Sequence, residues 1–303
     1  MGQSIGATSV HLHMMSPMTQ HLFHRAVLLS GNGLAPYTYV LKDPLSQARK
    51  YAEVSGIKNY MNLTTSELAN KLRKLEPKVL IDATDAFKFW SVDELVVSRP
   101  VVEDCFVNDG FLCKDPIELW QKGEYAKMPI LTGFINGDGG VRGLAIVQNQ
   151  TLVDDLNKRF DYLAPKLIQI EQKDPELLQN QLNQVKSRYL KKNGLISKEN
   201  YNELVQIYTD RSFITPLYNS IQQNVALDQK HPVYLYKFSY KGPYSNSLFY
   251  TGTFTNYGVT HCDELIYILK SPDLIPIDFT SGSMEMKMRS ILLKYFVDFA
   301  ING

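Results

Sequence analysis

Three short apolar runs, each bounded by turn-forming residues, predict buried strands. They span residues 24–29, 128–134 and 232–238, and the first ends at a Ser-Gly-Asn-Gly turn. Runs of roughly four to eight apolar residues between turn residues are typical of strands that are covered on both faces. The chain therefore has the strands for a sheet with a buried interior.

The segments around these runs carry helical patterns. Residues 6–18 are helical by composition, Asp43 is placed to begin a helix, and residues 66–75 form a further helix candidate. The segment 115–123 has a proline in its first turn and a glycine at its end, which is the usual order of helix start and stop signals. Helices that alternate with short apolar strands indicate an α/β fold.

Two longer stretches predict helices that pack on a core. Residues 152–210 read as several helices, with an apolar stripe at helical spacing on one of them formed by Leu178, Leu182, Val185 and Tyr189. The segment 284–300 reads as a closing helix, and we expect one side of it to pack on the core through Met284, Met288, Ile291, Leu292, Tyr295 and Phe299.

Composition and charge narrow the function classes. The 303 residues are 44% hydrophobic and 21% charged, which suits a globular chain with a large core. The net charge of +1 gives no electrostatic reason to expect a nucleic acid or an anionic membrane as a partner. No apolar run reaches the roughly 18 residues of a membrane span, so no membrane-spanning helix is expected.

The cysteines and histidines do not predict a metal site. Cys105, Cys113 and Cys262 cannot all pair within one chain, so at least one thiol is free, and the sequence does not say which. There is no C-x-x-C motif, and His11 and His13 point away from each other on a helix. We expect neither a metal nor another cofactor.

The first residues, Gly2-Gln3-Ser4-Ile5-Gly6, form a G-x-S-x-G motif in front of a predicted helix. A serine at the tip of a sharp strand-to-helix turn needs a strained backbone, and flanking glycines remove Cβ atoms that would clash there. The helix that follows directs its first N–H groups toward a developing oxyanion. The motif makes Ser4 a candidate nucleophile, although turns that contain glycine and serine are common.

Partners for Ser4 follow in the order acid and then histidine, as in α/β-hydrolases. Asp138 lies in a glycine-rich loop directly after the predicted strand 128–134, and His261 follows the third strand and a polar loop. Taken alone, Asp138 also reads as a turn aspartate and His261 as a helix-capping loop histidine. The three residues are far apart in sequence and can meet only through the fold.

Several longer segments resemble landmarks of the type-B carboxylesterases, the group that contains cholinesterases and insect esterases. The resemblance spans essentially the whole chain and keeps the order of that family. It is carried by GQSIGATSVHLHMMSP (2–17), LFHRAVLLSG (22–31), RPVVED (99–104), DPIELWQKGEYAKMPILTGF (115–134), PVYLYKFSY (232–240), GVTHCDELIY (258–267) and YFVDFAING (295–303).

This resemblance implies an α/β-hydrolase fold and a serine ester hydrolase. Ser4 is then the nucleophile, His261 the general base and acid, and Asp138 the residue that orients His261. The family often has Glu at the position of Asp138. The backbone N–H of Ile5, where the family usually has Ala, is then an oxyanion donor.

Two further polar residues are implied to support these three. Ser30 resembles a serine that lies behind the acid, and it also reads as a hydroxyl that caps a strand end. Glu264 resembles a buried carboxylate near the base, and it also suits an early-helix position beside the helix dipole. Gln3 stands where many members have Glu. A neutral amide there favours a small uncharged ester over a cationic one as the substrate.

Members of this family begin well before the nucleophile and continue beyond the predicted helix 284–300. We therefore expect residues 1–303 to be a partial α/β-hydrolase domain, truncated at both ends, without the N-terminal strands of the sheet and the Gly-rich oxyanion loop. The alternatives to an esterase are a catalytically inactive cholinesterase-like binding or adhesion protein and a truncated product without function. The presence of Ser4, Asp138 and His261 together favours the esterase.

The sequence leaves localisation and oligomeric state open. Asn62 and Asn149 match the N-glycosylation pattern, which would suit a secreted protein. The segment 55–75 lacks the two cysteines that the family usually has there, which mildly favours a reducing compartment.

Overall fold

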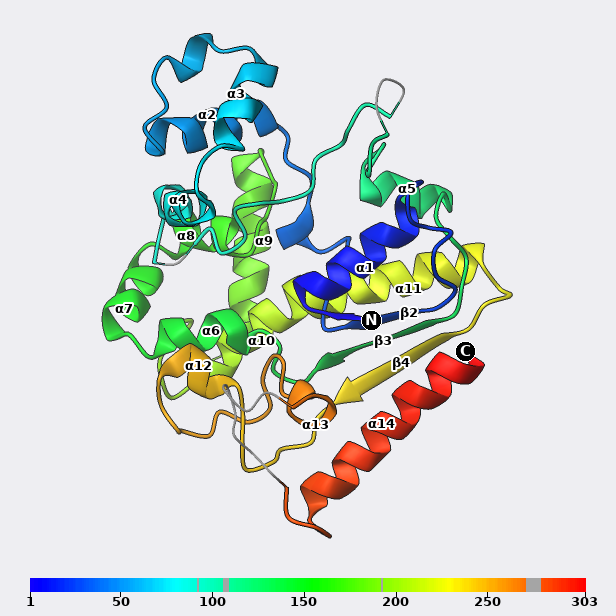
Figure 1. Cartoon of the computed structure of the whole chain (residues 1–303). Coiled ribbons are helices and arrows are strands. Elements are labelled where there is room, and N and C mark those ends of the chain that lie inside the picture. The colour runs from blue at the N-terminus through cyan, green and yellow to red at the C-terminus, as the bar shows by residue number, and fades with distance from the viewer. Residues whose placement is uncertain (92, 106–108, 192, 271–278) are drawn as a thin grey trace.

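The computed structural model describes residues 1–91, 93–105, 109–191, 193–270 and 279–303. Its centre is a parallel sheet in the order β1-β2-β3-β4 (Figure 1). The strands are β1 (Gly2–Gln3), β2 (Ala26–Leu29), β3 (Ile130–Ile135) and β4 (Val233–Phe238). The three predicted strands are confirmed, and the fold is α/β as expected. Burial of the third strand was predicted wrongly, since Tyr234 and Leu235 of β4 are 46% and 58% exposed.

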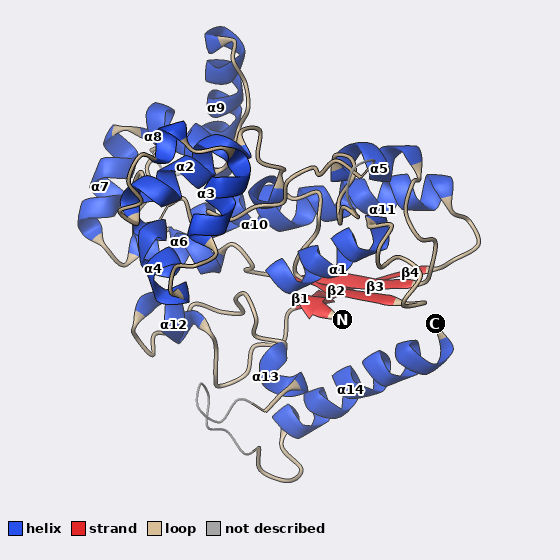
Figure 2. Cartoon of the chain, turned by 45° about the horizontal axis from the view of Figure 1, so that its top comes forward, coloured by secondary structure: helices blue, strands red, loops and turns tan. Residues whose placement is uncertain are grey.

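Helices cover both faces of this sheet (Figure 2). All four residues of β2 are buried, as are five of the six residues of β3, because α1, α5 and α11 lie on one face and α14 lies on the other. Helices α6 to α10 and α12 gather beyond the carboxyl ends of the strands (Figure 1). This edge of the sheet is therefore enclosed by helices.

The described ranges contain fourteen α-helices. The α-helices are α1 (Ile5–Met15), α2 (Pro44–Val54), α3 (Thr65–Leu72), α4 (Pro77–Ala83), α5 (Pro116–Lys122), α6 (Gly140–Val147), α7 (Gln150–Lys158), α8 (Phe160–Leu167), α9 (Pro175–Tyr189), α10 (Tyr201–Thr209), α11 (Thr215–Leu227), α12 (Ser247–Thr251), α13 (Leu265–Ile268) and α14 (Met284–Asn302). Three 3₁₀ turns and one π-helical turn complete them: η1 (Pro36–Thr38), η2 (Tyr60–Asn62), η3 (Thr84–Phe87) and the π-helical η4 (Asp210–Ile214).

The helix signals in the sequence act as predicted. The Asp43 side chain accepts a hydrogen bond from the Ser46 N–H at 2.9 Å and so caps α2. Gly123 ends α5 in the left-handed conformation with φ of 72°, where a side chain would be strained. The first helix is shorter than predicted and ends before Ser16-Pro17, since the residue before a proline is disfavoured in helical conformation.

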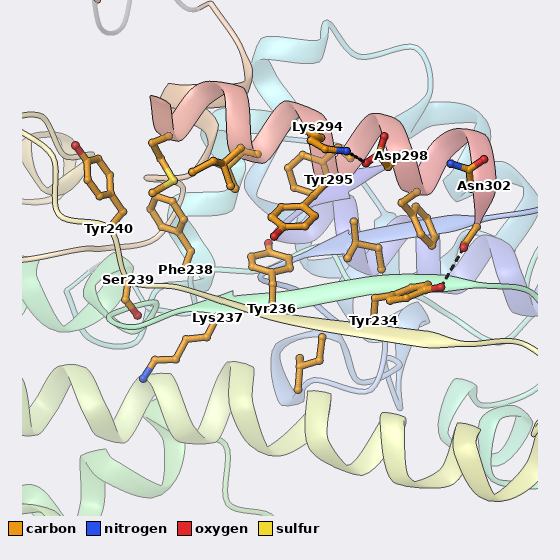
Figure 3. Close-up of a pocket in the computed structure, with 18 residues that line it drawn as sticks. Tyr234, Tyr236, Lys237, Phe238, Ser239, Tyr240, Lys294, Tyr295, Asp298 and Asn302 are labelled. Carbon is orange, nitrogen blue, oxygen red and sulfur yellow. Dashed lines mark hydrogen bonds and ion pairs between the residues drawn. The ribbon is translucent and has the colours of Figure 1, made fainter. Parts of the chain in front are cut away.

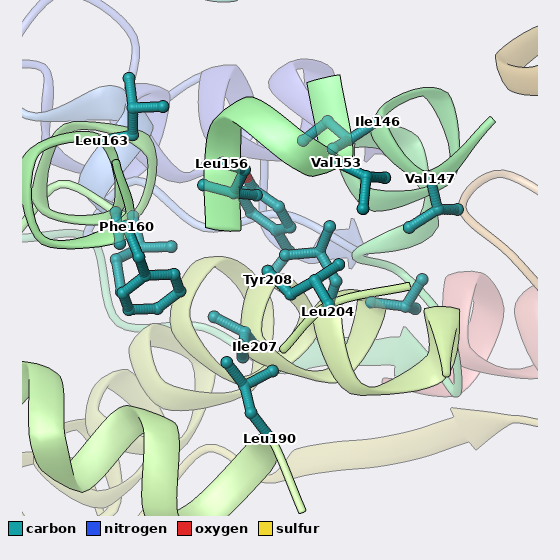
Figure 4. Packing of buried hydrophobic residues seen from close by; sticks show 14 of the residues in the cluster. Ile146, Val147, Val153, Leu156, Phe160, Leu163, Leu190, Leu204, Ile207 and Tyr208 are labelled. Carbon is teal, nitrogen blue, oxygen red and sulfur yellow. The ribbon is translucent and has the colours of Figure 1, made fainter. Parts of the chain in front are cut away.

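The helical layer has its own hydrophobic core (Figure 4). The predicted stripe on α9 packs against it: Leu182 is buried, and Leu178, Val185 and Tyr189 are partly buried beside it. Core packing by this stripe is therefore confirmed.

The prediction for the closing helix was wrong in part. Leu292 and Phe299 of α14 are buried, and Met288 and Phe296 pack beside the sheet, but Ile291 and Tyr295 are 48% and 65% exposed. Met284 is exposed as well. The spacing of apolar residues along a helix predicts how wide its apolar face is. The sheet covers only part of the apolar face of α14.

The uncovered part of that face borders a groove of about 810 Å³ between β4 and α14. Figure 3 shows Tyr234 and Tyr236 of β4 directed toward the helix that carries Tyr295. The Tyr234 hydroxyl donates to the Gly303 carbonyl at 3.1 Å, which fixes the end of α14 to the strand.

Replacement of Leu182 by Ala tests the core of the helical layer. Leu182 is 1% exposed, so Leu182→Ala is expected to lower the free energy of unfolding by about 2–5 kcal/mol through lost burial and the cavity left behind. Leu177→Ala on the same helix is the control. Its side chain is 52% exposed, and the expected change is within about 0.5 kcal/mol. Urea unfolding followed by circular dichroism measures both, and equal midpoints would contradict the assignment of this core.

Candidate active site

Ser4 occupies a sharp turn between β1 and α1. Its backbone has φ 57° and ψ −123°, a conformation that residues with side chains rarely adopt. The Ser4 N–H donates to the Leu29 carbonyl of β2 at 2.8 Å, and the Ser4 carbonyl accepts from the Thr8 N–H at 3.0 Å. The strained turn is therefore held from both sides by the sheet and the helix.

Close backbone approach explains one of the two motif glycines. A Cβ atom on Gly2 would lie 2.1 Å from the Gly6 carbonyl oxygen, so no side chain fits there. A Cβ atom on Gly6 would meet nothing within 4 Å, so the expected clash at the second glycine does not occur. Gly31 was not predicted to matter here, but a Cβ atom on it would lie 2.1 Å from the Ser4 carbonyl oxygen.

The structure brings Ser4, His261 and Asp138 together in one hydrogen-bonded line. His261 Nε2 lies 2.8 Å from Ser4 Oγ, and His261 Nδ1 lies 2.7 Å from Asp138 Oδ1. His261 is 3% exposed and Asp138 is fully buried. The second Asp138 oxygen accepts from the Ile135 N–H at 2.7 Å, which fixes the carboxylate at the end of β3.

These contacts indicate which atoms of Ser4, His261 and Asp138 carry a proton. An ionised Asp138 only accepts hydrogen bonds, so neutral His261 carries its proton on Nδ1 and offers Nε2 as acceptor to the Ser4 hydroxyl. Burial lowers the pKa of His261, but the hydrogen bonds to Asp138 and Cys262 and the Asp138 charge outweigh burial and raise it. The imidazolium that would form on proton transfer from Ser4 is therefore stabilised.

Ile5 is the first residue of α1, so its N–H is not used by the helix ladder. Its side chain is 44% exposed and borders the same cavity as Ser4 and His261. An N–H at this position beside the Ser4 hydroxyl is suited to a negatively charged oxygen.

The cavity in front of Ser4 has a volume of about 280 Å³. Apolar and polar side chains line it together. They are Ser4, Ile5, Tyr37, Phe89, Asp93, Glu94, Leu95, Val96, Val141, Arg142, Lys166, Leu167, Gln169, Tyr208, Ser212, Phe213 and His261. Phe213 comes from the π-helical turn η4 and lies 5.0 Å from the His261 ring, centroid to centroid.

Ser30 and Glu264 are both buried near this line. The Ser30 hydroxyl and both Glu264 carboxyl oxygens have no hydrogen-bond partner among the described residues. Ser30 therefore does not cap a strand through its hydroxyl, and Glu264, at the N-cap of α13, makes no capping bond. Burial, together with the nearby Asp138 charge, raises the pKa of Glu264 to about 8. Glu264 is therefore mostly neutral at pH 7 and places no second charge beside Asp138.

The loop that carries His261 is held by Asp263, which the sequence analysis missed. Its carboxylate accepts from the Thr260 N–H at 2.8 Å, the Asn246 N–H at 2.7 Å and the Ser245 hydroxyl at 2.9 Å. An acid two residues after the candidate base was the available signal in the sequence.

The structure settles the cysteine pairing that the sequence left open. Cys105 and Cys113 form a disulfide bond, and Cys262 beside His261 is free. Disulfide bonds are typical of proteins from oxidising compartments. The candidate glycosylation sites Asn62 and Asn149 are both exposed, but the Asn149 side-chain oxygen also caps α7 by accepting from the Thr151 N–H at 3.0 Å.

Within the described ranges, no three His, Cys, Asp or Glu side chains are grouped to hold a metal ion. No helix in the same ranges has the length and apolar character to cross a membrane.

Residues 1–303 match the family model described as "Carboxylesterase family". The juvenile hormone esterase of Tribolium castaneum is 28% identical over 314 residues, and venom carboxylesterase-6 of Apis mellifera is 25% identical over 303 residues. Each alignment covers 100% of this chain, but only 52% and 53% of the relative. The chain thus spans about half the length of the curated relatives that it matches.

A solved structure supports the fold. The crystal structure of juvenile hormone esterase from Manduca sexta, with OTFP covalently attached, superposes with a TM-score of 0.72 and 22% sequence identity. The match covers 98% of this chain and 55% of that one. The expected α/β-hydrolase fold is confirmed.

Replacement of Gly31 by Ala tests the close approach behind Ser4. The new Cβ atom would lie 2.1 Å from the Ser4 carbonyl oxygen and 2.9 Å from the Ala7 Cβ atom. We expect Gly31→Ala to lower the free energy of unfolding by about 1–3 kcal/mol. Gly6→Ala in α1 is the matched control, expected to be neutral or to stabilise by up to about 1 kcal/mol, because its Cβ atom meets nothing and Ala favours helix. Urea unfolding compares the two, and an equal loss in both would show that Gly31 is not needed for the close approach to Ser4.

Proposed function

The chain belongs to the carboxylesterase family, and we propose that it hydrolyses carboxylic esters at Ser4 through an acyl-serine intermediate. The observation that carries the proposal is the hydrogen-bonded line from Ser4 Oγ through His261 to Asp138, with distances of 2.8 and 2.7 Å. Because the chain covers about half the length of its relatives, the experiments below use the protein at the full length that its gene encodes.

The proposed reaction has two steps. Ser4 Oγ attacks the ester carbonyl while its proton moves to His261 Nε2, and the oxyanion that forms accepts a hydrogen bond from the Ile5 N–H. The tetrahedral intermediate then collapses, and the alcohol leaves with the proton from His261. A water molecule next gives a proton to His261 and attacks the acyl-serine, after which the carboxylic acid leaves and Ser4 regains its proton. Asp138 stays ionised throughout.

The charges around the cavity favour an uncharged ester as the substrate. Two carboxylates, Asp93 and Glu94, and two cations, Arg142 and Lys166, border it, so their charges cancel. The residue before the nucleophile is Gln3, whose amide nitrogen lies 3.3 Å from His261 Nε2 and carries no charge. A cationic or anionic ester therefore gains little from the field of the cavity.

The nucleophile is tested by covalent labelling and by turnover. A fluorophosphonate probe is expected to label Ser4 stoichiometrically, and Ser4→Ala should lose labelling and about 10⁴-fold or more in kcat/KM for p-nitrophenyl butyrate. Ser9→Ala, on the next turn of α1 and exposed, is the matched control and should retain both.

Two outcomes would contradict this proposal. Undiminished turnover by Ser4→Ala would place the nucleophile elsewhere. A folded wild-type protein that neither reacts with the probe nor hydrolyses any ester would favour the alternative of a non-catalytic binding protein.

The role of Asp138 is tested by the pH dependence of kcat/KM. His261 acts as a base only when neutral, so activity falls as the pH drops through the pKa of His261. Burial lowers that pKa and Asp138 raises it, so Asp138→Asn should move the acid limb of the profile to lower pH. The same variant should lose roughly 10³- to 10⁴-fold in turnover, because an amide neither fixes the tautomer nor stabilises the imidazolium.

Asp154→Asn, an exposed aspartate on α7, is the control for this change and should leave the profile unchanged. An acid limb that stays in place in Asp138→Asn, with near-normal turnover, would show that another group orients His261.

A further inference from the structure

The loop that carries Asp138 and the loop that carries His261 are in direct backbone contact. A Cβ atom on Gly137 would lie 2.4 Å from the Val259 carbonyl oxygen, so the two loops approach more closely at this point than a side chain on residue 137 would allow. The proposed reaction uses the Asp138 and His261 side chains and says nothing of this second contact between their loops.

Thr260, the residue before His261, lies at the centre of this contact. It is 1% exposed, and its hydroxyl donates to the Gly137 carbonyl at 3.2 Å. A Cβ atom on Gly140 would lie 2.1 Å from Thr260 Oγ1, so the hydroxyl occupies space that this glycine leaves free. The Thr260 N–H is held as well, because it donates to the Asp263 carboxylate at 2.8 Å. Both the backbone and the side chain of Thr260 are therefore fixed.

The bond from Thr260 to Gly137 connects the proposed acid and the proposed base by a short path. Gly137 directly precedes Asp138, and Thr260 directly precedes His261. The bond thus joins the two backbones one residue away from each functional side chain. A displacement of about 1 Å between reacting groups can cost about 10²-fold in rate, so a contact at this place can control the reaction without touching the substrate.

We propose that Thr260 is a positioning residue, whose hydroxyl bond to the Gly137 carbonyl sets the position of His261 Nδ1 relative to the Asp138 carboxylate. The proposal rests on the proposed ester hydrolysis at Ser4. Thr260 is not among the described residues that border the cavity, so it does not contact a substrate held there. Loss of its hydroxyl is therefore expected to lower kcat and to leave KM nearly unchanged.

The position of His261 also affects its pKa. The groups that face it come from several elements: Asp138 after β3, Cys262 in its own loop, Glu264 at the N-cap of α13, Tyr250 on α12, the uncharged Gln3 and Ser4 at the turn between β1 and α1, and Phe213 of η4. The hydrogen bond and the charge of Asp138 raise the pKa of His261 against the effect of burial. A looser contact with Asp138 lowers that pKa. The other groups are the same in wild type and variant, so a comparison of the two isolates the change at Asp138.

The test replaces Thr260 by Val and by Ser in the full-length protein. Val keeps the shape of the side chain without the hydroxyl, whereas Ser keeps the hydroxyl. We expect Thr260→Val to lower kcat for p-nitrophenyl butyrate about 10-fold, with KM within about 2-fold of wild type. The acid limb of its kcat/KM profile should move to lower pH. Thr260→Ser should have near wild-type kcat and a wild-type profile.

Thr132→Val is the matched control. Thr132 is 2% exposed, and its hydroxyl donates to the Leu28 carbonyl at 3.1 Å, so the same kind of buried bond is lost inside the sheet. This variant is expected to be less stable, with kcat and the pH profile unchanged.

Gly140→Ala reaches the same contact from the acid loop. Its Cβ atom would displace the Thr260 hydroxyl, so this variant should reproduce the kinetics of Thr260→Val. If Thr260→Val does not fold, the comparison of Gly140→Ala with Thr132→Val provides the test.

Proton NMR separates this proposal from the proposed reaction. The hydrogen bond between His261 Nδ1 and Asp138 gives a far-downfield proton resonance, which is identified by its absence in His261→Gln and needs no substrate. In Thr260→Val and Gly140→Ala this resonance is expected to move upfield, because the bond is longer. If no ester is hydrolysed but the resonance moves, the reaction is wrong and the positioning role stands. A resonance that stays in place in both variants would overturn the proposal, and so would an equal loss of kcat in Thr132→Val.

Discussion

Parallel pairing of four strands is the constraint on which the rest of the structure depends. Because the strands run in one direction, the residues that follow β1, β3 and β4 all leave the sheet at the same edge. Ser4 follows β1 directly, Asp138 follows β3 after two residues, and the loop with His261 comes after β4. Ser4, Asp138 and His261, which are far apart in sequence, thereby come into contact, with distances of 2.7 Å from His261 to Asp138 and 2.8 Å from His261 to Ser4. The general tendency of open α/β sheets to form their sites at this edge follows from the same geometry.

Burial of charge at that edge is tolerated only because nearly every charge has a partner. Asp138 is balanced by hydrogen bonds from His261 and the Ile135 N–H, and Arg142 is paired with Asp93. Glu264 is the exception, since neither oxygen has a hydrogen-bond partner in the described ranges, and burial raises its pKa. Its burial is tolerated because the carboxyl group is mostly neutral. The site is therefore polar without accumulating uncompensated charge next to the proposed base.

The sequence predicted those parts of the structure that depend on local pattern. The strands, the capped helices α2 and α5 and the stripe on α9 follow from periodicity and from Asp, Pro and Gly at helix ends. Ser4, Asp138 and His261 were found because a motif and a fixed order of residues mark them. Their contacts depend on strand order, which no local pattern contains.

Features that depend on tertiary packing were missed. The exposed part of α14 is as apolar in sequence as the buried part. The two differ only in whether the sheet covers them. Asp93 and Tyr208 carry no motif, and their proximity to Arg142 arises from a loop and a helix far apart in the chain. Gly31 reads as an ordinary turn glycine, although its role is to let the Ser4 carbonyl approach.

One helix links the proposed acid to the polar wall of the cavity. The Thr209 hydroxyl at the end of α10 accepts from the Gly139 N–H at 2.8 Å, directly after Asp138 in sequence. A Cβ atom on Gly139 would lie 2.1 Å from the Val205 carbonyl oxygen of α10, so only glycine permits this contact. Tyr208 is the neighbour of Thr209, and the π-helical turn that follows carries Phe213 to the His261 ring. A shift of α10 would therefore move the acid loop, Tyr208 at the cavity wall and the packing of the base together, so in this fold the position of the acid and the shape of the cavity cannot vary independently.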